Sequence, residues 1–98
     1  MEFDKNKHIE KMAKPVEKLL AVLKKDNISF APNDGDNNVV FTRDGKEVHM
    51  AQHSFYRFSG ISSVYKEKGE FMIPVPVTDE MYLFDFMKPI IYILLDHA

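Results

Sequence analysis

The sequence contains no cysteine, which excludes disulfide bonds, thiolate metal sites and a cysteine nucleophile. Glycine and proline are also few, at four and five residues. Together with 45% hydrophobic and 29% charged residues, this composition excludes a disordered or fibrous chain. The 98 residues suffice for a single domain, residues 1–98, with one modest core, because folding hides about 65% of the surface of an unfolded chain of this size.

Motifs for catalysis and cofactor binding are absent from the sequence. It has no Ser-His-Asp order, no glycine-rich phosphate loop, and no His-Glu-x-x-His or Cys-x-x-Cys pattern. The four glycines are explained as turn residues. We therefore expect no enzymatic activity, no catalytic residues and no cofactor.

Two short patterns that resemble metal sites are incomplete. Asp34, Asp36 and Asn38 have the spacing that opens a calcium loop of the EF-hand type, but the required glycine and the bidentate glutamate are missing further along. His49 and His53 stand four residues apart without a third ligand in reach. We expect no metal, and we interpret residues 32–38 as a polar connection.

No apolar run is long enough to span a membrane. The most apolar stretch, residues 79–98, is interrupted by Asp85 and Lys88 and falls short of the ~20 apolar residues that a spanning helix needs. The N-terminal residues include acids and have no apolar h-region, so they do not indicate a secretory signal. We expect a cytoplasmic protein.

The net charge of −2 hides an uneven distribution of charge along the chain. Residues 1–26 contain seven lysines and five acids, whereas residues 27–98 contain six basic and ten acidic residues. On a helix, five of the early lysines fall within a narrow arc, and they are the candidate partner-binding residues. We call them the lysine face: Lys7, Lys11, Lys14, Lys18 and Lys25. The alternatives are a solvated helix surface and a site for phosphates or an acidic protein.

An amphipathic helix is predicted for residues 4–26, because the apolar residues recur there at spacings of three and four. Pro15 leaves two possibilities, a helix that starts there or one helix with a kink. The apolar stripe continues across Pro15, which favours one continuous helix. Asn27 is the expected left-handed residue at its end.

The dipeptide Asp44-Gly45 predicts a two-residue β-hairpin between two alternating segments. This turn fixes the register, so that Val39 pairs with Met50 and Phe41 with Val48 on the core face. A short strand at residues 28–31 precedes the hairpin, and a helical turn or short helix at residues 51–58 follows it.

A second hairpin is predicted around residues 67–69, between segments 62–66 and 70–77. Its second segment contains Pro74 and Pro76, which lack their N–H donors on the same side of the strand. That side cannot pair, so we expect residues 73–77 to form an edge strand.

The apolar residues from 79 to 98 predict a C-terminal helix, capped by Thr78 or Asp79, whose apolar arc is wider than that of an ordinary surface helix. Pro89 should kink it, because proline clashes with the carbonyl four residues earlier, that of Asp85. The alternative is a break at Lys88 followed by a buried strand at residues 90–95.

We predict a homodimer through this helix, since the rest of the chain has too little surface to cover so wide an apolar arc. Two lines of side chains run along the helix, one for the sheet and one for a second copy. The candidate interface residues are Phe84, Phe86, Ile90, Ile91, Ile93 and Leu95.

The predicted fold is α+β, with an N-terminal amphipathic helix, an antiparallel sheet of two hairpins with four to five strands, and a C-terminal apolar helix kinked at Pro89. The predicted function is a small non-enzymatic protein-binding module, a regulator or inhibitor that acts by binding a partner protein. In length and lysine content the chain resembles bacterial and phage accessory proteins. The alternative is a winged-helix-like nucleic-acid-binding protein that uses the lysine face and the hairpin tip at Arg43 and Lys46.

Overall fold

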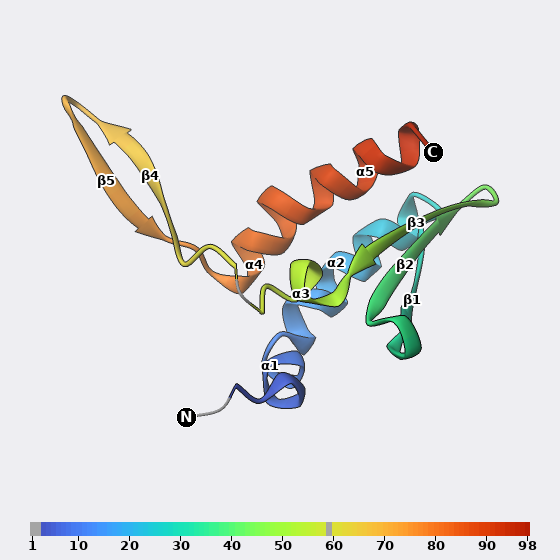
Figure 1. Ribbon diagram of the computed structural model, residues 1–98. Helices are drawn as coiled ribbons and strands as arrows, with labels where there is room; N and C mark the ends of the chain where they lie inside the picture. Colours follow the sequence, from blue (N-terminus) through green and yellow to red (C-terminus); the bar gives the residue numbers. More distant parts are fainter. Residues whose placement is uncertain (1–2, 59) are drawn as a thin grey trace.

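A computed structural model describes residues 3–58 and 60–98 and has an α+β fold with helices at both ends (Figure 1). The strands form two separate antiparallel sheets, one of three strands and one of two. The predicted class and the helical ends are therefore confirmed. The prediction of one continuous sheet was wrong.

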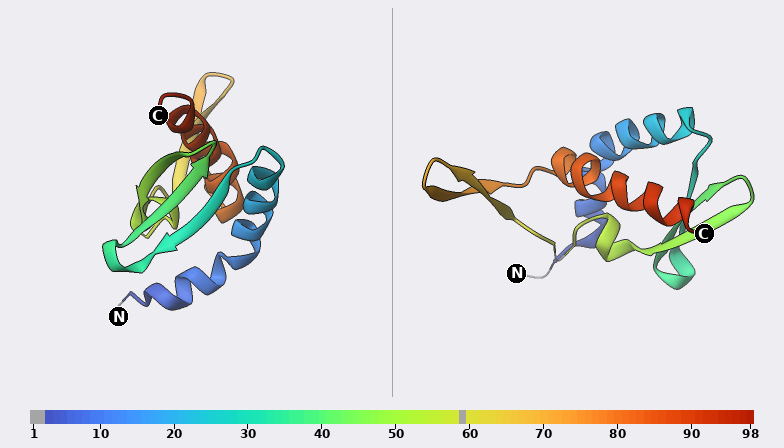
Figure 2. Two further views of the ribbon diagram at one scale, coloured as in Figure 1. Left: turned by 90° about the vertical axis from the view of Figure 1, so that its right-hand side faces the viewer. Right: turned by 90° about the horizontal axis from the view of Figure 1, so that it is seen from above.

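The N-terminal helical segment is divided into α1 (Lys5–Lys11) and α2 (Ala13–Lys25), which follow one another at an angle (Figure 2). Only Met12 separates them, and its N–H and C=O keep the helical bonds to His8 and Val16, so the segment resembles the one helix with a kink that the sequence favours. Pro15 has no N–H to donate to the carbonyl of Lys11, and the helix bends at Met12, which stays in the right-handed helical region with φ −87° and ψ 0°. The apolar stripe nevertheless continues into α2, where it packs on the core.

The three-stranded sheet contains β1 (Ser29–Asn33), β2 (Asn38–Arg43) and β3 (Lys46–Ala51) in that order. The register of the β2–β3 hairpin is the predicted one, with Val39 opposite Met50 and Phe41 opposite Val48. Its turn residues both have positive φ, 52° at Asp44 and 79° at Gly45, as a type I′ turn requires. Between β1 and β2 lies the short 3-10 helix η1 (Asp34–Asp36) in the expected polar connection.

After β3 comes the short helix α3 (Gln52–Phe55), which brings aromatic side chains to the core. Phe55 is fully buried, and its ring lies 5.5 Å from those of Phe30 and Phe41, between centroids. The predicted helical turn is thus confirmed. Phe58 is only partly buried beside this cluster.

The second hairpin, β4 (Ser63–Lys68) and β5 (Phe71–Pro76), stands away from the rest of the molecule (Figure 1). We call residues 63–76 the arm. The radius of gyration is 14.9 Å, against about 13 Å for a compact domain of 100 residues. Pro74 and Pro76 face the outer side of β5 and cannot donate hydrogen bonds to another strand, which is one reason why this edge does not join the larger sheet.

The C-terminal segment is helical throughout, so the helix was the right choice over a strand at residues 90–95. It runs through α4 (Asp79–Met81), the π-helical η2 (Tyr82–Met87) and α5 (Lys88–Asp96). The hydroxyl of Thr78 caps it by accepting from the N–H of Met81 at 3.1 Å.

Pro89 is accommodated by a wide turn in the helix. In η2 the N–H of Lys88 bonds the carbonyl of Leu83, five residues earlier. A turn widened in this way moves the Asp85 carbonyl away from the proline ring, and π-helical turns are a recognised source of helix bending. The irregularity expected at Pro89 therefore takes the form of a π-helical segment in the preceding turn.

The core lies where α2 and α5 meet the three-stranded sheet, with α2 against β1 and α5 against β2 and β3 (Figure 2). Its fully buried side chains come from the helical segments and from β2: Met12, Leu19, Leu23, Val39, Phe41, Phe55, Leu83, Ile91 and Leu95. The arm contributes none of them. The body and the arm are therefore stabilised by different interactions.

Replacing Ile91 with alanine should lower the free energy of unfolding by about 2–5 kcal/mol, because the side chain is fully buried and its loss leaves a cavity. Ile93→Ala, two residues along the same helix and 57% exposed, is the matched control and should change it by less than about 0.5 kcal/mol. Urea unfolding followed by circular dichroism measures both. Equal losses would contradict the assignment of Ile91 to the core and Ile93 to the surface.

Candidate functional site

The lysine face is exposed along its whole length. Lys7, Lys11, Lys14, Lys18 and Lys25 all have exposed side chains. Lys18 Nζ lies 3.5 Å from Glu80 Oε2 of α4, and both side chains are well exposed. Such a pair contributes little stability, but it places an acid inside the lysine face.

The tip of the β2–β3 hairpin is tied to the C-terminal helix. Arg43 Nη2 donates to Asp96 Oδ1 at 2.6 Å, and this bond raises the pKa of Arg43. The Tyr92 hydroxyl donates to Asp26 at the end of α2, and burial together with this bond raises the pKa of Tyr92 to about 12. Arg43 is therefore held against a carboxylate, whereas a wing that reads nucleic acid needs free cations at its tip.

The predicted dimer residues are divided between the core and the surface. Ile91 and Leu95 are fully buried against the sheet, so the structure removes them from the candidate interface. Phe84 and Phe86 are half-buried against the core. What remains outside is the C-terminal ridge, which we define as Ile90, Ile93 and Leu94. Leu94 was not among the predicted interface residues.

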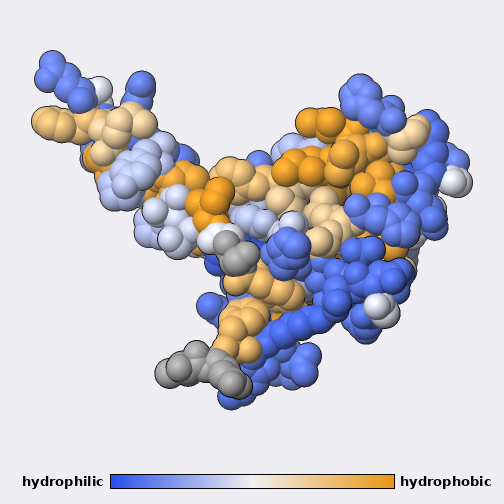
Figure 3. Space-filling view, viewed as in Figure 1, coloured by the Kyte–Doolittle hydropathy of each residue, from blue (hydrophilic) through white to orange (hydrophobic). Residues whose placement is uncertain are grey.

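The arm carries the two most exposed large apolar side chains of the described residues, those of Phe71 and Tyr65. Figure 3 shows the arm projecting from the body, with hydrophobic and hydrophilic residues mixed on its surface. Phe71 is 72% exposed, Tyr65 66% and Met72 57%. The strand register puts apolar residues on both faces. One face holds Val64, Lys66, Lys68, Phe71, Ile73 and Val75, and the other holds Ser63, Tyr65, Glu67, Met72, Pro74 and Pro76. The mixed character of both faces is the sequence signal that this hairpin does not cover the core, since a core hairpin alternates apolar with polar residues.

Arg57 holds the base of the arm. Its Nη1 donates to the carbonyl of Val77 at 2.7 Å and to that of Ile61 at 3.2 Å, on the two legs of the hairpin. Its Nη2 donates to Asp79 Oδ1 at 2.5 Å, and both of these side chains are only 15% exposed. The guanidinium also lies over the ring of Tyr82, 5.6 Å from its centroid.

The backbone around Arg57 is specialised for this arrangement. Arg57 itself has φ 56°, a left-handed conformation that costs free energy in a residue with a side chain. A Cβ on Gly60 would lie 2.3 Å from Cγ of Arg57, so a side chain there would displace the arginine. Sequence reasoning did not single out Arg57 for this role, because its partners are 4 to 22 residues away and form no motif.

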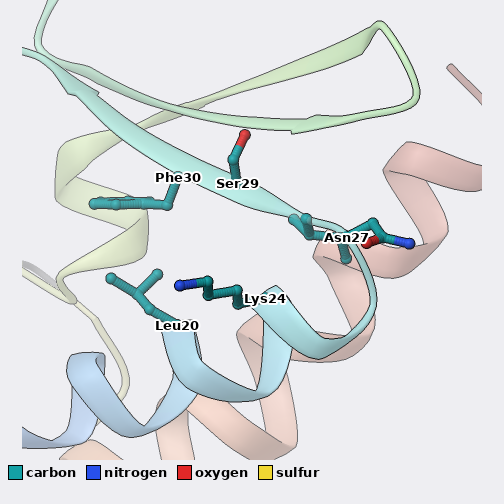
Figure 4. A pocket seen from close by; sticks show the side chains of 6 residues that line it. Leu20, Lys24, Asn27, Ser29 and Phe30 are labelled. Carbon is teal, nitrogen blue, oxygen red and sulfur yellow. The ribbon is translucent and has the colours of Figure 1, made fainter.

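A hollow of about 510 Å³ lies between the end of α2 and the start of β1 (Figure 4). Leu20, Lys24 and Phe30 line it together with Asn27, Ile28 and Ser29. These residues offer one cation and an apolar wall, without a carboxylate or imidazole that could act as a general base. The hollow therefore has no catalytic arrangement of its own.

Within residues 3–58 and 60–98, no three histidine or acidic side chains come together as a metal site would need. Of the helices in this part of the chain, none combines the length and apolar character that crossing a bilayer requires. Comparison with models of protein families, with characterised proteins and with solved structures finds no match. The arm and its base are the features that best distinguish this surface.

Replacing Arg57 with methionine should lower the free energy of unfolding by about 3 kcal/mol, because the carboxylate of Asp79 stays largely buried without its partner. Methionine keeps a Cβ, so the cost of the left-handed backbone is unchanged. The control Arg43→Met breaks a pair whose acid is 62% exposed and should cost less than about 1 kcal/mol. Urea unfolding compares the two variants, and equal losses would mean that Arg57 does not fix the base of the arm.

Proposed function

We propose that the chain is a small non-enzymatic protein-binding module and that the arm is its principal binding element. The observation that carries the proposal is the projecting pair of strands with Tyr65, Phe71 and Met72 on its surface. A monomer that exposes so much apolar surface on a projecting element fits an interaction site better than a structural role.

The chemistry of the arm suits a protein partner. Each of its large side chains contributes about 1.5–3 kcal/mol when a partner buries it fully, and aromatic anchors typically dominate such interfaces. Lys66, Glu67, Lys68 and Glu70 surround them with charges of both signs. An apolar centre with a charged rim is the usual composition of a protein–protein interface. A nucleic acid would instead favour a uniformly positive surface.

The proposal includes a biological role as a regulator or inhibitor in the cytoplasm, of the kind found among bacterial and phage accessory proteins. A module without catalytic groups acts by occupying a surface of its target. The C-terminal ridge provides a second apolar contact on the body, and the lysine face provides charge for an acidic partner. These finer features depend on the arm being a binding element.

The double variant Phe71→Ser/Met72→Ser should abolish retention of partner proteins from the source cell. Both side chains lie on the arm outside the core, so folding should be unaffected. The control Phe3→Ser removes another exposed aromatic side chain, 58% exposed, that lies outside the arm near the N-terminus. The measurement is quantitative mass spectrometry of proteins retained by each immobilised variant, with nucleases present. We expect at least about tenfold loss for the arm variant, or about 1.4 kcal/mol, and no change for Phe3→Ser.

Equal retention by the arm variant and the unmodified chain would overturn the proposal. Micromolar, salt-sensitive binding of DNA or RNA, lost on replacing Lys7, Lys11, Lys14 and Lys18 by glutamine, would favour the nucleic-acid alternative instead.

A further inference from the structure

We infer that the open edge of β4 pairs with β4 of a second copy of this chain, which joins two arms into one four-stranded antiparallel sheet. This inference rests on the proposed function, because it treats the arm as a binding element. It names one partner, the chain itself, and assigns the contact to the edge of the arm rather than to its faces.

The outer edge of β5 is closed to further strands. The N–H of Val77 donates to the carbonyl of Ser62 at 3.0 Å, which shows that every second residue from Phe71 to Val77 points toward β4. Pro74 and Pro76 therefore point outward, where they offer no N–H. A strand that approached β5 from outside would find two donors missing in succession.

The outer edge of β4 is open. By the same alternation, Ser63, Tyr65 and Glu67 direct their backbone N–H and C=O groups away from β5. Among the described residues, these groups have no hydrogen bond to the body. They form a row of donors and acceptors of the kind that natural proteins normally cover or block.

The side chains of β4 are compatible with a two-fold pairing centred on Tyr65. Centred on Tyr65, the pairing puts Tyr65 opposite its copy, Val64 opposite Lys66 and Ser63 opposite Glu67. The outward residues then form the hydrogen-bonded pairs of an antiparallel ladder. Pairings centred on Lys66 or Glu67 would set like charges directly opposite each other, which is destabilising.

The four-stranded sheet would also order the apolar side chains. Since Pro74 stands opposite Tyr65 in the arm, the centred register aligns two prolines and two tyrosines in one row across one face. On the other face, Val64 and Val75 extend toward Lys66 and Ile73 of the second copy, where the lysine stem covers apolar surface. The prolines close both outer edges, so the sheet stops at four strands and the assembly is a dimer.

The marginal stability of a lone hairpin and the large accessible surface of the chain both favour a second strand at the edge of β4. An isolated two-stranded hairpin is marginal in water, whereas three or more strands form a stable sheet. The accessible surface of the chain is 6828 Å². A compact monomer of its mass has about 5,800 Å², so roughly 1,000 Å² is in excess. This excess is similar to the ~800 Å² that each partner buries in a standard interface. We therefore still expect a homodimer, with the arm in place of the C-terminal helix as the contact between the two copies.

A proline in place of Tyr65 tests the pairing directly. Its missing N–H would face outward, so the hydrogen bonds within the arm remain while the edge is blocked. The control Tyr65→Thr removes the aromatic ring and keeps the N–H. Light scattering across dilution should give a dimer for the unmodified chain. The Tyr65→Pro variant should weaken dimerisation at least about tenfold more than Tyr65→Thr does.

A cysteine cross-link provides a second test that does not depend on the proline variant folding. The chain has no other cysteine. In Tyr65→Cys, the two Cα atoms across the two-fold axis would lie about 5.5 Å apart, within disulfide range, so mild oxidation should give a covalent dimer. In Glu67→Cys the same atoms would be more than about 10 Å apart and should not cross-link.

Three results would overturn the inference: an unmodified chain that stays monomeric at high micromolar concentration, a dimer that survives Tyr65→Pro, or equal cross-linking of the two cysteine variants. The proposed function fails separately. If the chain is monomeric while Phe71→Ser/Met72→Ser still loses its partner proteins, the arm binds proteins and the self-pairing is wrong. If the dimer forms but that variant keeps its partners, the self-pairing stands and the wider function is wrong.

Discussion

The three hydrogen bonds and the one cation–π contact of Arg57 fix the position of the arm. One guanidinium bonds both legs of the hairpin, at Ile61 and Val77, and the first residue of the C-terminal helix, Asp79. Without these bonds two carbonyls and a buried carboxylate would lose their partner at the same point. The body therefore depends on Arg57 to start its last helix, and the arm depends on it for direction.

The arm and the body differ in where they place their apolar residues. The body hides its apolar residues between α2, α5 and the three-stranded sheet, whereas the arm exposes apolar residues on both of its faces. A hairpin that is not covered by its own chain gains stability only from something else that covers it. Because the prolines of β5 block its outer edge, another chain can cover only the edge of β4 and the two faces of the arm. This restriction explains how an exposed pair of strands avoids open-ended association.

Much of the fold could be predicted from local patterns. The register of β2 and β3 followed from Asp44-Gly45, and the helical ends followed from the spacing of apolar residues. The errors concern contacts between distant residues. The hairpin that contains Phe71 was expected to join β2 and β3 in one sheet, although neither of its faces is polar. Ile91 is buried and Ile93 is exposed because only one side of the helix meets the sheet. The sequence did not indicate which side, since apolar residues occupy most of the helix circumference.

Amide hydrogen exchange of the arm, measured residue by residue, tests most directly whether its edge is covered by protein. The N–H groups of Val64 and Lys66 point toward β5, whereas those of Ser63, Tyr65 and Glu67 point outward. The account predicts that the inward amides are protected at every concentration and that the outward ones become protected as the concentration of the chain rises. Outward amides that exchange freely at all concentrations would contradict it.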